Sequence, residues 1–281
     1  MGSGRKSPPP PYAPADNLPT SLPPYMATRV SADESMPIYL KAYFDHYPFS
    51  RVFHLGESSK NPLYTVSARE SKSSTVLLTL HKGSSRKGPI IASMELPPRA
   101  HSLYEGSIDV PPQISGSGSG EDKKGSGSVF VKHYSDWREA KHVFKMKVGV
   151  GKNTWTEEFE WRRSHGPEVQ DIDRDQKGYK LVRLGGAKAG SISGDGGPRV
   201  WRQKGEASDG REVVAAFAAS QAVLNTKVFK FKRMRSGATG ELGTHFAIVA
   251  LTSALKIWCI EHGCTDGIAG IESVFNKFVR K

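Results

Sequence analysis

Basic residues are the side chains whose types and spacing first suggest a binding chemistry in this sequence. Residues 227–235 carry five positive charges and no acid, and two further basic pairs lie upstream. On neighbouring strands such side chains would form a patch for inositol phosphates or phospholipid headgroups, with about 1 kcal/mol per basic residue near an anionic leaflet. The candidate anion-binding residues are Lys145, Lys147, Arg162, Arg163, Lys230 and Lys232. The alternative is a solvated outer face on which lysine discourages aggregation.

The net charge of the whole chain, +12, agrees with an anionic partner but does not choose among nucleic acid, acidic protein and membrane. Phe229 and Phe231 alternate with the lysines, as stacking residues do in RNA-binding proteins. These rings share a face with Arg233, however, and the sequence contains no recognisable nucleic-acid-binding module. RNA binding is therefore the weaker alternative. The two rings are more simply explained as strand residues that face the inside of a β-barrel.

Catalytic and metal-binding patterns do not stand out. The nine histidines are scattered, and Cys259 and Cys264 have no histidine pattern near them that would complete a zinc site. Neighbouring side chains on a strand point to opposite sides, which argues against Ser164 and His165 as nucleophile and base. The acidic segment 171–175 lacks the glycine and final glutamate of a calcium loop. We expect a protein that is not an enzyme and that needs neither metal nor cofactor.

The first 36 residues are rich in proline, serine and alanine and predict a disordered tail. Two segments in this tail match the short tyrosine-containing motifs that WW domains bind as extended polyproline helices. Their motif residues are Pro9, Pro10 and Tyr12, and Leu22, Pro23 and Tyr25. A WW-domain protein is therefore an alternative partner. The first residues lack an apolar run, so we expect no secretory signal.

The elements that must position the basic residues are short alternating segments typical of half-buried antiparallel strands. The alternation is clearest where Phe144, Met146 and Val148 interleave with Lys145 and Lys147. Twelve segments predict strands: 52–55, 63–68, 76–80, 90–96, 103–110, 129–134, 143–148, 155–161, 179–184, 199–203, 212–218 and 228–234. The glycine-rich stretches 115–128 and 185–198 predict flexible loops.

One apolar helix follows these strands, with a glycine turn before it and Thr244 at the expected N-cap. Its apolar residues cover most of the circumference, and Thr252, Lys256 and Cys259 form a thin polar line. The apolar residues are Phe246, Ile248, Val249, Leu251, Leu255, Ile257, Trp258 and Ile260. A helix that is apolar nearly all round must be enclosed, and this run is shorter than the roughly 20 residues of a membrane span.

A closed antiparallel barrel around this helix satisfies both patterns, because it leaves no free sheet edge and hides the whole helix. The sequence thus predicts a mainly β protein with a barrel of about twelve strands at residues 37–265, provided that the amine of Lys256 reaches a mouth of the barrel. Residues 266–281 predict a short amphipathic tail.

Several short motifs resemble the tubby C-terminal-like superfamily, which includes tubby proteins, phospholipid scramblases and LURP-one-related proteins. They are Phe-Glu-Trp-Arg-Arg-Ser at 159–164, Lys-Leu-Val-Arg-Leu at 180–184, Val-Val-Ala at 213–215 and Gly-Glu-Leu-Gly at 240–243, completed by the helix at 246–260. The chain is most similar to fungal tubby C-terminal-like domain proteins. The resemblance spans residues 38–262 and implies a twelve-stranded barrel around a hydrophobic helix. The basic phosphoinositide motif of animal tubby proteins and the calcium segment of scramblases are both missing.

Together these patterns favour an intracellular, cytoplasmic binding protein that attaches peripherally to anionic membranes through its basic residues. The alternatives are an adaptor that recruits a WW-domain protein through its tail, and an RNA-binding protein.

Overall fold

The computed structural model describes residues 36–44, 51–68, 74–97, 105–111, 127–135, 140–174, 177–185, 205–219 and 229–262. Several predictions lie outside these residues: the tail with both tyrosine motifs, nearly all of the two glycine-rich loops, the strand at 199–203, Cys264 and the segment 266–281.

Twelve strands, two short helices and one long helix make up the described fold. The strands are β1 (Tyr39–Tyr43), β2 (Val52–Ser58), β3 (Asn61–Ala68), β4 (Val76–Lys82), β5 (Ile90–Glu95), β6 (Gly106–Asp109), β7 (Val129–Ser135), β8 (Ala140–Val150), β9 (Asn153–Ser164), β10 (Lys177–Arg183), β11 (Val213–Ala219) and β12 (Phe229–Arg233). The helices are α1 (Pro167–Gln170), α2 (Ser236–Thr239) and α3 (Gly243–His262).

The strands form a closed antiparallel barrel, as the sequence predicts. Each strand pairs with the next one along the chain, and β1 closes the barrel by pairing with both β12 and β2. The sequence prediction missed β1, although Leu40 and Ala42 are buried and alternate with less buried residues. Closure leaves every described strand with two neighbours, so the barrel has no exposed edge for another chain to extend.

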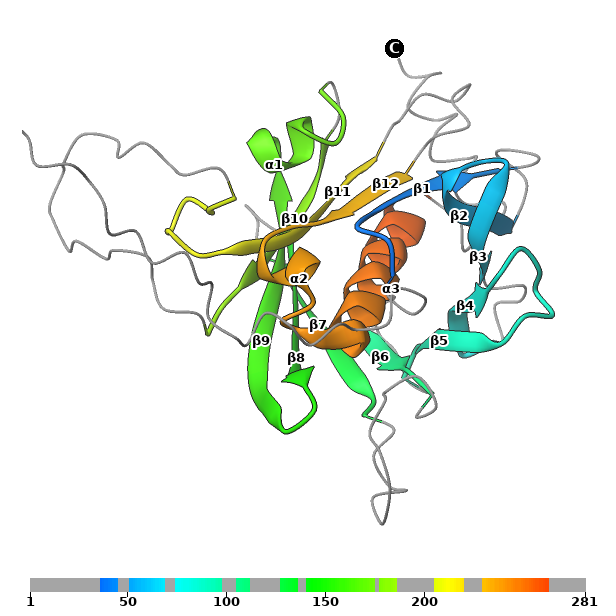
Figure 1. The fold of residues 1–281 in the computed structure, drawn as a ribbon, viewed down its shortest axis with the longest axis horizontal. Coiled ribbons are helices and arrows are strands. Elements are labelled where there is room, and N and C mark those ends of the chain that lie inside the picture. Colours follow the sequence, from blue (N-terminus) through cyan, green and yellow to red (C-terminus); the bar gives the residue numbers. More distant parts are fainter. Residues whose placement is uncertain are drawn as a thin grey trace, which may run out of the picture. The chain divides into compact units, whose positions relative to one another are not determined.

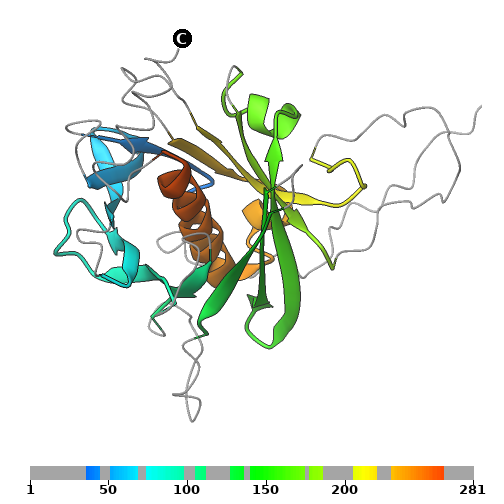
Figure 2. The same cartoon turned by 180° about the vertical axis from the view of Figure 1, so that it is seen from behind.

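The helix α3 runs through the inside of the barrel, with strands on all sides of it in both views (Figures 1 and 2). Seven of its eight predicted core residues are at most 2% exposed, and Ile260 near its end is partly buried. The prediction of an enclosed apolar helix is therefore confirmed. The helix α3 begins at Gly243, where φ is +82°, so Thr244 lies in the first turn and not at the predicted N-cap position.

By length and composition alone, α3 is the one helix in the described residues that could cross a membrane. Most of α3 is buried by the barrel. Its aromatic side chains pack against rings of the surrounding strands. The Trp258 ring lies 5.3 Å from the Phe229 ring and 5.4 Å from the Phe53 ring, measured between centroids. Phe246 near the other end packs on Phe159 of β9 at 4.8 Å. These contacts tie α3 to strands from both halves of the chain.

Lys256 departs from its prediction, because its amine does not reach a mouth of the barrel. The residue is 0% exposed, and burial lowers the pKa of its ammonium group from 10.5 to about 7, against the opposing effect of the Glu105 carboxylate. The lysine therefore loses its proton far more readily than an exposed lysine does, which reduces the cost of holding it inside the core.

The other two helices cover specific parts of the barrel (Figure 1). On the outer wall, α1 places Val169 against Ala216 and Ala218 of β11. Small alanine side chains let this short helix approach the sheet closely. The second, α2, directly precedes α3 and contacts β11, where Gly237 lies close to the Val214 carbonyl. A Cβ at Gly237 would lie 2.2 Å from that oxygen, so the contact requires glycine.

Candidate binding surface

The six predicted anion-binding residues do not lie on one set of adjacent strands. Lys145 and Lys147 belong to β8, and Arg162 and Arg163 to the neighbouring β9. The two lysines of β12 are separated from β9 by β10 and β11. The structure therefore divides the candidates into a group on β8 and β9 and a distant pair on β12.

Three of the six have acidic partners that were far away in the sequence. Arg162 donates to the Asp209 carboxylate over 2.9 Å and to Glu160 over 2.8 Å. Arg163 reaches Glu261 of α3 over 2.5 Å. The Lys230 ammonium lies 2.5 Å from the Asp173 carboxylate, beside α1.

These three cations are engaged within the protein, which reduces their availability to an anionic ligand.

Lys145 and Lys147 are different, because both are exposed and neither has an acidic partner within the described residues. They project from the outer face of β8, while Phe144, Met146 and Val148 between and beside them are buried in the barrel. Lys232 also has no ion pair in the described part of the chain, but it is half-buried between Tyr39 and Ala216 in the sheet register.

The adjacent strand β7 extends this basic region with residues that the sequence reading did not single out. Its inner residues Val129 and Val131 are buried, so the alternate positions face outward. Phe130 is 42% exposed and Tyr134 53% exposed, two of five large apolar side chains exposed in the described residues. We define the β7–β8 outer face as Phe130, Lys132, Tyr134, Lys141, Val143, Lys145 and Lys147.

The β7–β8 outer face contains four lysines, two aromatic rings and no acid. In the register, Lys132 lies opposite Val143 and Tyr134 opposite Lys141. Acids border it on both sides: on β9 Glu158 lies opposite Lys145, and Glu160 lies 3.9 Å from Lys141, while on β6 Asp109 is half-buried. The basic strip is thus narrow, and its exposed cations are Lys132, Lys145 and Lys147.

The alternation of residue types in 129–134 predicts a strand with two different faces, one of which is part of the β7–β8 outer face. Valine, valine and histidine alternate with phenylalanine, lysine and tyrosine. An aromatic residue on a strand usually packs in the core, so the pattern alone does not tell which of the two sets faces inward. The closure of the barrel determines that the two valines face inward and the two aromatic rings face outward.

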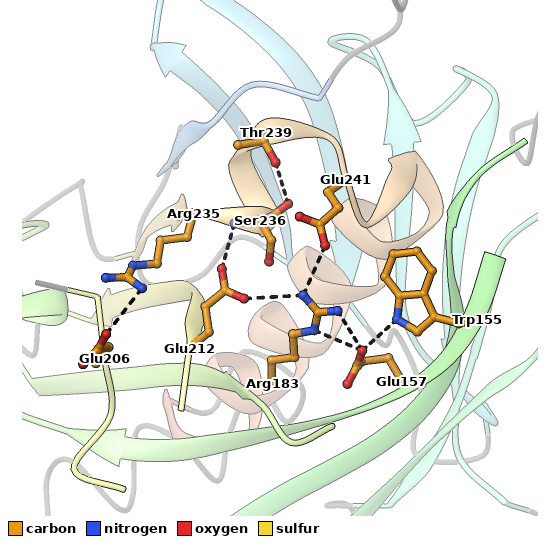
Figure 3. Close-up of polar contacts among 9 residues, drawn as sticks. All are labelled: Trp155, Glu157, Arg183, Glu206, Glu212, Arg235, Ser236, Thr239 and Glu241. Atoms are coloured by element: carbon orange, nitrogen blue, oxygen red, sulfur yellow. Dashed lines mark hydrogen bonds and ion pairs between the residues drawn. The ribbon is translucent and has the colours of Figure 1, made fainter. Parts of the chain in front are cut away.

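A second group of polar side chains surrounds Arg183 at the barrel end where α3 begins (Figure 3). The Arg183 guanidinium lies 3.0 Å from the Glu157 carboxylate, 3.5 Å from Glu212 and 3.2 Å from Glu241. The Trp155 indole donates to Glu157 over 2.8 Å. Glu157 itself is 5% exposed and shares the inward face of β9 with Trp155, Phe159 and Trp161, an inward acid that the alternation pattern did not predict.

This Arg183 cluster ties together strands, α2 and the start of α3. The second oxygen of Glu212 accepts a hydrogen bond from the Ser236 backbone amide over 2.9 Å, at the first residue of α2. Glu241 lies in the turn before α3. Burial and charge pairing fit a structural role, in which one guanidinium holds the α2–α3 connection against the barrel wall.

At the other end of α3, a third polar group joins the helix to β9 and β10. Tyr179 and Arg163 both donate to the same oxygen of Glu261, each over 2.5 Å. The Arg163 guanidinium also lies 5.7 Å from the centre of the Tyr179 ring. Burial, followed by the Glu261 carboxylate, raises the pKa of the Tyr179 hydroxyl, so it remains a proton donor.

Two histidines lie beside this group, on the inward faces of β7 and β8. The rings of His133 and His142 are 4.7 Å apart, and Tyr179 lies 6.2 Å from His142. Burial and the nearby positive charge of Lys256 lower the pKa of His142 to about 3, so it is neutral near pH 7. A lysine and a histidine with low pKa values are useful in catalysis, but a substrate must reach them. Lys256 is fully enclosed, so these groups do not form an accessible site.

Among the residues that the structure describes, no group of three histidine, cysteine or carboxylate side chains could hold a metal ion. The best candidate site for an external ligand is therefore the β7–β8 outer face.

Comparisons of the chain with protein-family models, with curated proteins and with solved structures gave no match.

Proposed function

We propose that this chain is a non-catalytic binding protein of the tubby C-terminal-like type, which binds anionic phospholipid headgroups inside the cell through the outer lysines of its barrel. The observation that carries the proposal is that Lys145 and Lys147 are exposed on β8 and have no acidic partner in the described residues. Lys132 on β7 adds a third such cation to the same outer face.

The architecture supports a binding role. The barrel interior is filled by α3 and its aromatic contacts, so an external ligand must bind to the outside. A twelve-stranded closed barrel around one apolar helix is also the arrangement that the tubby-like resemblance predicts. Exposed lysines near an anionic leaflet each contribute about 1 kcal/mol, and three of them give a useful attraction without any deep pocket.

Co-sedimentation of the full chain with vesicles tests the proposal. Vesicles of neutral phospholipid are compared with vesicles that contain a phosphoinositide, at about 0.15 M salt. We expect selective sedimentation with the anionic vesicles. The double variant K145E/K147E should lose affinity by about thirty-fold or more, because it removes two contributions of about 1 kcal/mol and adds repulsion.

A matched control separates a site from an effect of net charge. Lys60 and Lys87 are exposed and lie between β2 and β3 and between β4 and β5. The variant K60E/K87E therefore changes the net charge equally at positions away from β8. Equal losses in the two variants would contradict a site on β8, and absence of wild-type binding both to either vesicle and to a soluble inositol phosphate would contradict the proposed function.

A further inference from the structure

We infer that the β7–β8 outer face docks on the bilayer surface itself, with the rings of Phe130 and Tyr134 entering the interface between lysines that contact the phosphates. This inference rests on the proposed function, which is the binding of anionic phospholipid headgroups. It adds that the ligand is the intact bilayer surface and not an isolated, soluble headgroup. It also gives an orientation, in which the barrel lies with the β7 and β8 strands against the membrane.

The exposure of the two rings is the first support. Phe130 and Tyr134 are 42% and 53% exposed although they belong to a strand whose other face is buried in the barrel. Apolar surface that stays exposed among polar residues on one face of a protein marks contacts with partners or membranes, and both rings lie on the same outer face of β7, on either side of Lys132. Tyrosine in particular is enriched at the level of the lipid headgroups, where its ring is apolar and its hydroxyl is hydrated.

The arrangement of rings and cations is the second support. Lys132 lies between the two rings along β7, with Lys141, Lys145 and Lys147 on the adjacent β8, and the face contains no acid. All of these side chains project from one side of two paired strands. A flat anionic surface can therefore meet the rings and the ammonium groups at the same time, which is the charge complementarity that a bilayer requires.

A nucleic acid is the competing partner, because it also combines stacking with phosphate contacts. Phe130 and Tyr134 are four residues apart on one strand, so their Cα atoms are about 13 Å apart at the usual rise of a strand. That spacing is too long for stacking on successive bases. The face is also the outside wall of a closed barrel and not a groove that follows a single strand. These features favour the bilayer.

Vesicle binding across a range of salt concentrations tests the inference with the full chain. Contacts between exposed charges weaken at about 1 M salt, where the Debye length is about 3 Å, whereas buried rings continue to contribute. We expect wild-type binding to phosphoinositide vesicles to retain a salt-resistant part. The variant F130S/Y134S keeps the net charge and should lose about tenfold in affinity, together with this salt-resistant part.

A control and a second ligand make the result specific. Ile38 and Ile90 are each 49% exposed and lie away from β7 and β8, so I38S/I90S removes similar apolar surface elsewhere. We expect it to bind vesicles as the wild type does. A soluble inositol phosphate, measured by titration calorimetry, should bind weakly and be insensitive to F130S/Y134S.

The outcomes separate the inference from the proposed function. If K145E/K147E abolishes vesicle binding while F130S/Y134S binds as wild type at every salt concentration, ring insertion is overturned and headgroup binding stands. If the protein binds inositol phosphate but no vesicle, the bilayer is likewise overturned. If it binds neither, both proposals fail. Binding to single-stranded RNA that F130S/Y134S removes, without vesicle binding, would assign this face to nucleic acid instead.

Discussion

Tyr179 of β10 donates a hydrogen bond of 2.5 Å to Glu261 of α3, across 82 residues of sequence. The same carboxylate oxygen accepts from Arg163 of β9, so two strands are joined to the last turns of the central helix. Most contacts of α3 are apolar and therefore not directional. This pair orients the C-terminal end of the helix, as the buried hydrogen bond of 2.9 Å from the Trp161 indole to the Ser253 hydroxyl does nearer its middle.

Removing this hydrogen bond should destabilise the protein measurably. We expect Tyr179→Phe to lower the free energy of unfolding in urea by about 1–2 kcal/mol, since it leaves the partly buried Glu261 carboxylate with one donor fewer. Tyr134→Phe is the matched control, because Tyr134 lies on the outer face and has no hydrogen bond in the described residues. A control variant that is destabilised equally would show that the effect comes from tyrosine in general.

Arg183 should matter more for stability than any of its carboxylates singly. Arg183→Met would leave the buried Glu157 without its cation, and removal of one partner from a buried pair commonly costs about 3–5 kcal/mol. Glu241→Gln, at the exposed side of the same cluster, should change stability by less than about 1 kcal/mol. Thermal and urea unfolding of the two variants would reveal the difference, and equal losses of stability in the two variants would contradict the larger contribution of Arg183.

Lys256 should make stability depend on pH in the alkaline range. Its pKa falls from 10.5 in the unfolded chain to about 7 in the barrel, so the unfolded state binds more protons between these values. The free energy of unfolding should therefore rise with pH across this window, by up to about 1.4 kcal/mol per pH unit. Below about pH 7 both states are protonated and the full penalty remains.

Lys256→Met tests this dependence, because methionine fills a similar volume without a charge. The variant should lose the rise in stability between about pH 7 and pH 10.5, and it should be more stable than the wild type at pH 7 and below. Lys147→Met is the control, since that lysine is exposed. An unchanged slope in Lys256→Met would show that the buried ammonium does not titrate in this range.

His142 should contribute to acid sensitivity. Its pKa is lowered from 6.5 to about 3 by burial and by Lys256, so the unfolded chain takes up a proton first as the pH falls. Stability supported by the neutral ring is present above pH 6.5 and is lost progressively down to about pH 3. His142→Gln should show a shallower loss in acid urea titrations, whereas His165→Gln, at an exposed position, should follow the wild type.

Glu158 borders the proposed membrane-binding face and should weaken it. It lies opposite Lys145 in the register, so its carboxylate reduces the local positive potential. Glu158→Gln should raise the affinity for phosphoinositide vesicles by about fivefold, the equivalent of one charge of about 1 kcal/mol. The same change should leave binding to neutral vesicles unaltered. A decrease in affinity would indicate that Glu158 contributes to the site and does not limit it.

The fold class follows from local patterns in the sequence. Alternation in 143–148 and 155–161 predicted strands with one buried face, because successive side chains on a strand point to opposite sides. The apolar circumference at 246–260 predicted an enclosed helix, because such a surface is costly in water. A barrel around a helix is the arrangement that satisfies both, and the structure has this arrangement.

The candidate binding surface depended on contacts that no local pattern contains. Arg162 with Asp209, Lys230 with Asp173 and Arg163 with Glu261 are paired across 47, 57 and 98 residues. Strand closure and register decide these pairs, and they separate the engaged cations from Lys145 and Lys147. The same closure turns Phe130 and Tyr134 outward and Glu157 inward. The sequence determined which residues are basic, aromatic or apolar; only the tertiary structure decided which of them face solvent without a partner, because that depends on which distant strands the barrel brings side by side.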